Sequence, residues 1–238
     1  MPTFDQATGK VDPGAADTTS LTYSVTVGAG GDDILLVGNG AISGTGLTAT
    51  FDGDAMTSTA NLTVSDGALR VFYLTGNGNK TGNVVVGQDT ASRMASSAIS
   101  FTDVHQTTPF RDSDTNTGDV NAITVPSAGS VTSDDADIGV SLISAVGVTP
   151  DFVLDGPDGT LRDLQSSTGS GADIDEGAST VAGAGAGISE TWTAGDANNH
   201  AMCVWLASLQ APAAGGGNEN TPRHLPRGAS RGVLRGAI

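Results

Sequence analysis

Apolar and polar positions alternate along most of this chain with the spacing of β-strands. Residues Leu21–Val27 carry apolar side chains at every second position and hydroxyl side chains between them, so one face of this segment is buried and the other is wet. Ile34–Val37 is apolar throughout, which predicts a central strand. Further strands are expected at Leu47–Phe51, Ala68–Leu74, Asn83–Val86, Ala98–Val104, Ala122–Val125, Ile138–Val146, Thr180–Ala182, Glu190–Thr193 and His200–Leu209.

Turn residues separate these segments at intervals of about ten residues, which is the spacing of a sandwich or barrel. Gly28–Asp33 and Gly76–Asn79 are rich in glycine, aspartate and asparagine, which supply the positive φ angles of tight connections. Helix-period patterns with capping residues are missing. The sequence therefore predicts an all-β protein, an antiparallel β-sandwich of jelly-roll type with an extended C-terminal tail.

Composition divides the chain into three parts. Residues 1–17 are expected to form an N-terminal arm, and residues 18–212 are expected to form one β-sandwich domain. Within that domain, residues 161–187 are rich in Gly, Ser, Ala and Asp and are expected to form a long loop. Residues 213–238 are expected to form a glycine-rich hinge and an arginine-rich docking tail.

Charge is distributed very unevenly between the tail and the rest of the chain. The 238 residues hold 10 Lys plus Arg and 26 Asp plus Glu, a formal net charge of −16. Four of the ten basic residues stand in the last eighteen positions. The acidic body should be repelled by nucleic acid and by anionic membranes, so neither is expected as a partner. The basic tail, in contrast, predicts a peptide that docks on another surface.

The tail repeats an arginine at every fourth position. Because four is an even number, an extended tail places these arginines on one side, with apolar residues between them. Pro222 and Pro226 oppose a helix. The alternative is a solvated tail without a partner. The residues expected to dock are Arg223, Leu225, Arg227, Arg231, Val233, Leu234 and Arg235.

One acidic segment resembles a calcium loop. Asp112, Asp114, Asn116 and Asp119 offer oxygen ligands near alternate positions, and a hard cation needs several such ligands on a tight turn. Gly118 stands one residue later than in an EF-hand, and the bidentate Glu is missing. The alternative is a solvated Asp-rich and Asn-rich turn. The weaker acidic groups, expected to be surface charge, are Asp52 with Asp54, Asp134 with Asp135 and Asp137, and Asp173 with Asp175 and Glu176.

Catalytic motifs are missing from the sequence. The three histidines are isolated, and no nucleophile elbow or metal-binding histidine pair occurs. The single cysteine, Cys203, lies in an apolar run and is expected to be a buried side chain rather than a nucleophile. No catalytic residue is therefore expected, and calcium is the one cofactor considered.

A resemblance to a known group rests on the order of several segments. These are Leu21–Val27, Ile34–Val37, Phe51–Met56, Arg70–Gly76, Thr81–Val86 and a closing His200–Leu206. Together they resemble the jelly-roll β-sandwich modules of tailed-phage virion proteins and some bacterial surface proteins, over about residues 18–210.

This resemblance implies a non-enzymatic virion structural protein, such as a capsid decoration protein of a phage. The tail would anchor it to the virion shell or to neighbouring subunits, and a homo-oligomer is expected. The first ten residues lack the basic start and apolar stretch of a secretory signal, so synthesis in the host cytoplasm and assembly into a virion are expected. The alternatives are a lectin-like or receptor-binding module of a fibre or adhesin, with calcium possible, and a polysaccharide-degrading enzyme.

Overall fold

The protein is built from strands alone in the part of the chain that the structure, a computed structural model, describes. That part comprises residues 1–11, 17–147, 154–167 and 173–212, and it contains seventeen strands and no helix. Every pairing between named strands is antiparallel. The strands are β1 (Thr3–Val11), β2 (Thr18–Val27), β3 (Ile34–Ile42), β4 (Thr48–Phe51), β5 (Asp54–Ala55), β6 (Thr57–Val64), β7 (Gly67–Thr75), β8 (Lys80–Ser92), β9 (Met94–Thr102), β10 (Phe110–Val120), β11 (Ala122–Val125), β12 (Ile138–Gly147), β13 (Leu154–Pro157), β14 (Thr160–Ser166), β15 (Asp173–Ala182), β16 (Glu190–Ala194) and β17 (His200–Leu209).

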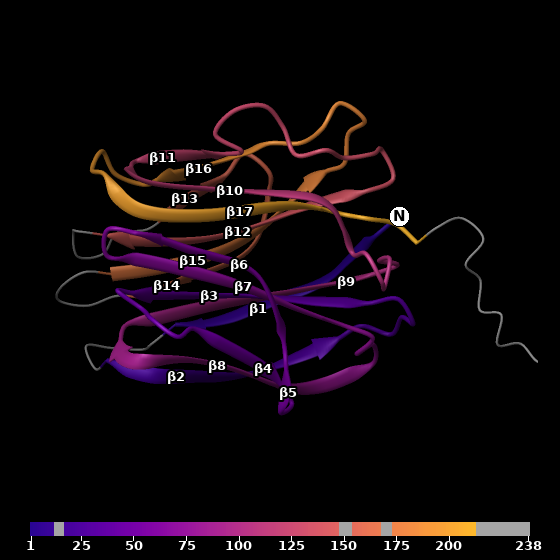
Figure 1. Cartoon of the computed structure of the whole chain (residues 1–238), viewed down its shortest axis with the longest axis horizontal. Coiled ribbons are helices and arrows are strands. Elements are labelled where there is room, and N and C mark those ends of the chain that lie inside the picture. Colours follow the sequence, from indigo (N-terminus) through magenta and orange to yellow (C-terminus); the bar gives the residue numbers. More distant parts are fainter. Residues whose placement is uncertain (12–16, 148–153, 168–172, 213–238) are drawn as a thin grey trace, which may run out of the picture.

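Four sheets stack as four layers, from bottom to top in Figure 1. The lower outer sheet has the order β2-β8-β4-β5 and the lower inner sheet β1-β9-β3-β7-β6; the upper inner sheet has the order β10-β17-β12-β15-β14 and the upper outer sheet β11-β16-β13. Three apolar cores, which contain Phe51, Trp205 and Trp192 respectively, fill the spaces between successive layers. The expected antiparallel β-sandwich is confirmed, whereas its jelly-roll type stays a prediction.

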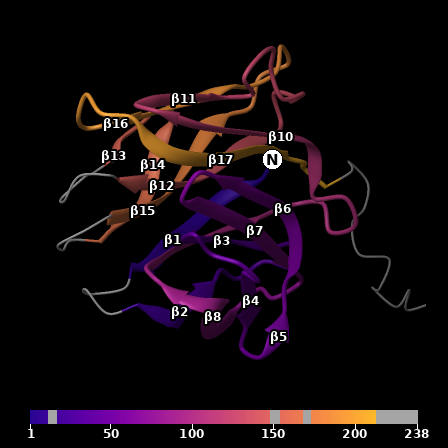
Figure 2. The same cartoon turned by 60° about the vertical axis from the view of Figure 1, so that its left-hand side comes forward.

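The two halves of the chain repeat one strand order. In the inner sheets, the order β1-β9-β3-β7-β6 of the first half corresponds strand by strand to the order β10-β17-β12-β15-β14 of the second half. In the outer sheets, β2-β8-β4 corresponds in the same way to β11-β16-β13. The irregularities repeat as well, because β1 has a register shift between Phe4 and Gln6, and β10 has one between Phe110 and Asp112. The halves β1–β9 and β10–β17 are therefore two copies of one sandwich, which Figure 2 shows as a lower and an upper half.

The halves pack through their inner sheets in a reciprocal way. The contact of β9 with β15 has its equivalent in the contact of β17 with β7, and the contact of β1 with β14 has its equivalent in that of β10 with β6. The equivalent strands β3 and β12 contact each other. Reciprocal contacts of this kind are those of a two-fold symmetric dimer. When β3 and β12 are aligned from their first residues, Gly40 of the first half corresponds to Ser144 of the second half. Gly40 pairs with Leu69 on the neighbouring strand and Ser144 pairs with Glu176, so Leu69 corresponds to Glu176.

Every strand expected from the sequence overlaps an observed one, but several polar strands were missed. Residues 3–11, expected within an N-terminal arm, form β1 at the edge of the lower inner sheet. Residues 161–187, expected as a long loop, contain most of β14 and all of β15. Both corrections have one cause: neighbouring strands supply the backbone hydrogen bonds, and the packed halves bury most of β15 and partly bury most of β14 although their sequences are polar.

Candidate functional site

The predicted docking residues lie outside the described part of the chain. They are Arg223, Leu225, Arg227, Arg231, Val233, Leu234 and Arg235, all within residues 213–238. The described chain ends at Pro212, three residues after β17, and Figure 1 shows this point beside the N-terminus. The backbone of Gln210 is held by hydrogen bonds, since its N–H donates to the Pro109 carbonyl and its carbonyl accepts from His105 N–H. The tail therefore starts from a fixed point on the upper inner sheet.

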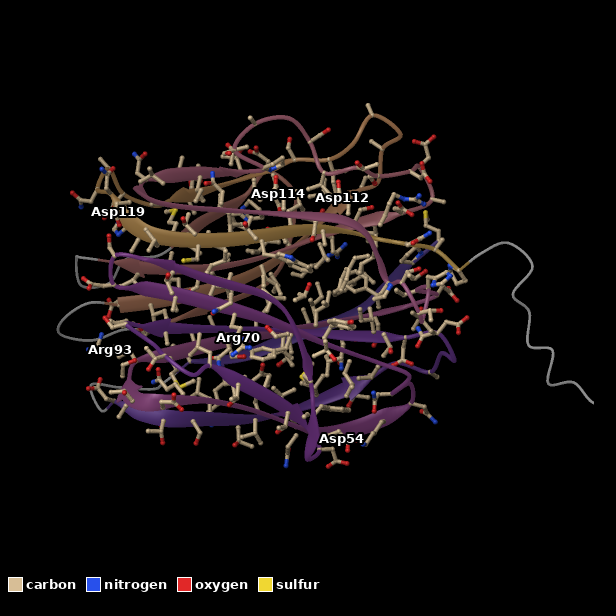
Figure 3. The ribbon with its side chains drawn as sticks, in the orientation of Figure 1. Asp54, Arg70, Arg93, Asp112, Asp114 and Asp119 are labelled. Carbon is tan, nitrogen blue, oxygen red and sulfur yellow. The ribbon has the colours of Figure 1, made fainter. Side chains whose placement is uncertain are left out.

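The segment expected to be a calcium loop is a strand. Asp112, Asp114, Asn116 and Asp119 all belong to β10, and Figure 3 shows Asp119 at the far end of that strand from Asp112 and Asp114. The amide of Asn116 donates to the Thr124 carbonyl at 2.7 Å.

Hydrogen bonds from the protein already occupy two of the carboxylates. Asp112 accepts from the Thr132 N–H at 2.8 Å, and this bond, against the opposing effect of partial burial, lowers the pKa of Asp112. The Asp119 carboxylate accepts from the Ser65 hydroxyl at 2.5 Å. Among the residues that the structure describes, no group of three or more His, Cys, Asp or Glu side chains could hold a metal ion. The tight turn that a calcium loop needs is therefore replaced by a straight edge strand.

Calcium is accordingly expected to leave the stability of the protein unchanged. A calcium site present only in the folded state would stabilise the protein by about 2.7 kcal/mol at a free calcium concentration of about 100 times its Kd. Thermal unfolding should give the same melting temperature with a chelator and with millimolar calcium. A reproducible rise with calcium, lost when Asp114 is replaced by Asn, would contradict this expectation.

Carboxyl groups buried inside the protein are the most distinctive feature of its chemistry. Three of them follow one another on β15, as Asp173, Asp175 and Glu176, and each has no exposed surface. These three groups and Asp137 are expected from the sequence to be surface charge, but the structure places all four inside the protein. Carboxylates are almost never fully buried unless they are paired. Each buried acid therefore needs its own physical account.

Asp173 and Asp137 are paired with arginines. Arg93 lies between β8 and β9, and its Nη1 donates to Asp173 Oδ1 at 2.7 Å. Arg111 contacts Asp137 through Nε and reaches Asp134 with Nη2 at 2.6 Å. Burial alone would raise the pKa of Asp137, but the hydrogen bonds from Arg111 and its neighbours hold it below its ordinary range. Each of these two buried acids is therefore paired with a guanidinium group.

Asp175 and Glu190 lie between the upper inner and upper outer sheets, and neither has an arginine partner among the contacts that the structure describes. Burial raises the pKa of Asp175 to about 7, although Oδ2 accepts from the Leu154 N–H at 2.7 Å. Burial also raises the pKa of Glu190, whose two oxygens both accept from the Ser179 hydroxyl at 2.6 and 2.7 Å. These two acids therefore hold protons more tightly than exposed acids do.

Glu176 differs from the four buried acids described above because both of its carboxyl oxygens lack a hydrogen-bond partner in the described protein. It lies between the two inner sheets, and the Ser144 hydroxyl opposite it on β12 also lacks a hydrogen-bond partner among the described residues. Burial raises the pKa of Glu176 well above its ordinary value, and the charge of Asp163 raises it further. Burial without a hydrogen-bond partner therefore favours the neutral form of the Glu176 carboxyl group.

Two glycines of the other half make room for this acid. A Cβ atom at Gly38 would overlap Glu176 Oε1, and one at Gly40 would overlap Glu176 Oε2 and the Ser144 hydroxyl. Glycine inside a strand marks a close approach of another group. The sequence Gly38-Asn39-Gly40 within the buried strand β3 is therefore the local signal that could have located the site.

A hollow of about 310 Å³ lies at one end of the upper inner sheet. Its walls include Met1, Ile138, Arg162 and Val181. The Arg162 guanidinium lies 4.1 Å from the centre of the Phe4 ring, and its Nε donates to the Thr180 hydroxyl at 2.8 Å. The hollow is therefore apolar on several sides, with one oriented guanidinium group.

The fold and these sites define a class, an all-β protein made of two fused antiparallel sandwiches with an acidic interior layer. Comparison with protein-family models, curated proteins and solved structures found no match to the chain. Within the described ranges, no helix is long and apolar enough to cross a membrane. The function must therefore be argued from the residues of this chain.

Proposed function

We propose that the protein is a non-enzymatic virion structural protein, displayed on a phage particle as a capsid decoration. In this proposal the double sandwich forms the displayed body, and the basic tail binds the virion shell or a neighbouring subunit. The observation that carries the proposal is the separation of charge. Residues 1–217 hold six Lys plus Arg against twenty-five Asp plus Glu, whereas residues 218–238 hold four Arg against one Glu.

The basic side chains of the body are already engaged by the body itself. Lys80 forms ion pairs with Asp52 and Asp54, and the pairs of Arg93 and Arg111 are described above. The remaining three bind carbonyls, hydroxyls or aromatic rings: Lys10 contacts the Thr22 carbonyl, Arg70 contacts Ser58, the Leu47 carbonyl and the Phe72 ring, and Arg162 contacts Thr180 and the Phe4 ring. The six basic residues of the body are thus engaged within the body, and the proposal assigns the binding of an external acidic surface to the tail arginines.

Charge alone would hold the tail weakly. Exposed ion pairs contribute about 0–1 kcal/mol each, so four of them require bidentate geometry and partial burial to give a stable attachment. The apolar residues Leu225, Val233 and Leu234 stand between the arginines and can supply this burial. The proposed partner surface is therefore an acidic groove with apolar walls.

The test is the copy number of tail variants on purified particles. Replacing Arg227, Arg231 and Arg235 together by Ala should abolish incorporation. Lysine at the same three positions should restore it in part, because an ammonium group cannot reproduce the planar fork of a guanidinium. Wild-type occupancy by the triple-Ala variant would contradict the proposal and point to an attachment site on the sandwiches.

A chain truncated after Pro212 is the matched control. It should fold and show a nearly unchanged melting temperature, because the described strands close both sandwiches without residues 213–238. A melting temperature many degrees lower would show that the tail belongs to the core, and loss of incorporation could then reflect unfolding.

A receptor-binding module of a fibre or adhesin is the second candidate. The hollow beside Arg162 supports it, because its volume of about 310 Å³ is at the lower end of the range for small-molecule sites. Binding of glycans by the truncated body, lost in Arg162→Ala, would favour this candidate over the tail-anchored one.

A further inference from the structure

Glu176 is a departure from the symmetry of the two halves. Its equivalent in the first half is Leu69, a fully buried residue of the central apolar core. One row of equivalent positions across three strands reads Ala95, Gly40 and Leu69 in the first half. In the second half that row reads Cys203, Ser144 and Glu176. The fold itself therefore does not require an acid at this place.

The departure is matched on the opposite sheet. Gly38 and Gly40 face Glu176, whereas their equivalents on β12 are the larger residues Leu142 and Ser144. The glycines and the acid thus fit each other across the boundary between the halves. We call Glu176, Gly38, Gly40 and Ser144 together the Glu176 contact.

The charged and titratable groups around the Glu176 contact are all acidic or neutral. On β14, Asp163 accepts from the Ser97 hydroxyl of β9 at 2.8 Å and adds a like charge. On β17, Cys203 lies two strands away in the same row, and on β2, Tyr23 bonds to Ser96 at 2.7 Å. On β3 and β12 the facing residues are the uncharged glycines, Leu142 and Ser144.

On β15 itself, the neighbouring acids do not share this space. Asp173 is paired with Arg93, and Asp175 faces β13 on the other side of the sheet. Within the described part of the chain, no cation is among the groups that influence Glu176, so no described group would balance its negative charge. An ionised Glu176 would be buried, unpaired and beside a second carboxylate, which is strongly unfavourable.

We propose that the Glu176 contact is a pH-sensitive joint between the two halves: the neutral acid closes it, and ionisation of the acid opens it. Opening separates β15 from β3 and brings water to the carboxylate. The apolar part of the same interface, where Leu69, Cys203 and Trp205 lie, contains no such acid, and opening of the joint exposes it to solvent together with the carboxylate.

The chain has its own reporter for this opening. Cys203 is the single cysteine, it is fully buried, and it lies in the row of Glu176. Burial, followed by the Glu176 charge, raises the pKa of the Cys203 thiol to about 12, so the closed protein resists thiol reagents. A thiol reagent added to the full-length chain therefore measures how often the joint opens.

The experiment compares the labelling rate of Cys203 in wild type and Glu176→Gln from about pH 6 to about pH 9. A proton released on opening changes the opening equilibrium by about tenfold per pH unit. Ionisation of the exposed thiol adds its own increase in both proteins. In a plot of the logarithm of the Cys203 labelling rate against pH, the slope for Glu176→Gln should therefore be smaller than the wild-type slope by about one.

Glu190→Gln is the matched control, because Glu190 is also buried but lies between the upper inner and upper outer sheets. It should keep the wild-type slope. If Glu176→Gln does not fold, Glu176→Leu, which takes the residue type of the equivalent position, should show the same reduced slope. Equal slopes in wild type and in the folded Glu176 variant would overturn the proposal.

Discussion

Replacing Gly38 by Ala is expected to destabilise the protein by about 1–3 kcal/mol, the usual range for inserting a group into a packed core. The added Cβ would overlap Glu176 Oε1, and the acid cannot move aside because it is enclosed between two sheets. In a protein of this size, such a loss lowers the melting temperature by about 2–4 °C per kcal/mol. Thermal and urea unfolding at a fixed acidic pH would measure it.

A second variant, Glu176→Ala, removes the carboxyl group that the methyl group of Ala at position 38 would overlap. The double variant Gly38→Ala with Glu176→Ala should lose less stability than the two single variants added together, since contacting residues couple. Gly31→Ala is the control, because a Cβ at Gly31 meets no atom within 4 Å and should change stability little. Additive losses in the double variant would show that Gly38 and Glu176 do not share the space.

The alternation of apolar and polar residues was enough to predict the fold class. Segments such as Leu21–Val27 and His200–Leu209 are strands because one or both faces are apolar, and this information is local. The strands β10 and β14 were missed because they are edge strands, whose outward side chains stay polar. Aspartates at alternate positions of β10 therefore resembled a metal-binding turn.

The duplication could not be read from the sequence because equivalent positions hold different residue types. Leu69 corresponds to Glu176 and Gly40 corresponds to Ser144, although Ile34 and Ile138 still match. Strand order depends on the pattern of burial and on the turns, so it survives such replacements. The repeat is visible in the pairing of strands and in the repeated register shifts.

The buried acids were hidden for a related reason. Asp173, Asp175 and Glu176 lie in a glycine-rich and serine-rich region, where carboxylates are normally exposed. The burial of Asp173 and Glu176 depends on Arg93 and Gly38, which are far away in the chain and belong to the other half. The arrangement is a property of the packed halves, and no short segment of the sequence contains it.

Replacing Arg93 by Ala is expected to cost about 3–5 kcal/mol, the usual cost of removing one partner of a buried ion pair. The side chains of Arg93 and Asp173 are 9% and 0% exposed, and their contact of 2.7 Å joins the two halves at the start of β15. Without the guanidinium, the Asp173 charge stays buried without its cation. The free energy of unfolding in urea at neutral pH would measure the loss.

Two further variants separate this explanation from a general effect of removing a long basic side chain. Lys80→Ala breaks the ion pairs with Asp52 and Asp54, whose side chains are 51% and 68% exposed, and such surface pairs contribute about 0–1 kcal/mol. Arg93→Met combined with Asp173→Asn removes both charges and should recover much of the stability lost in Arg93→Ala. Equal losses in Arg93→Ala and Lys80→Ala would contradict the expectation, because the buried pair would then be worth no more than a solvated one.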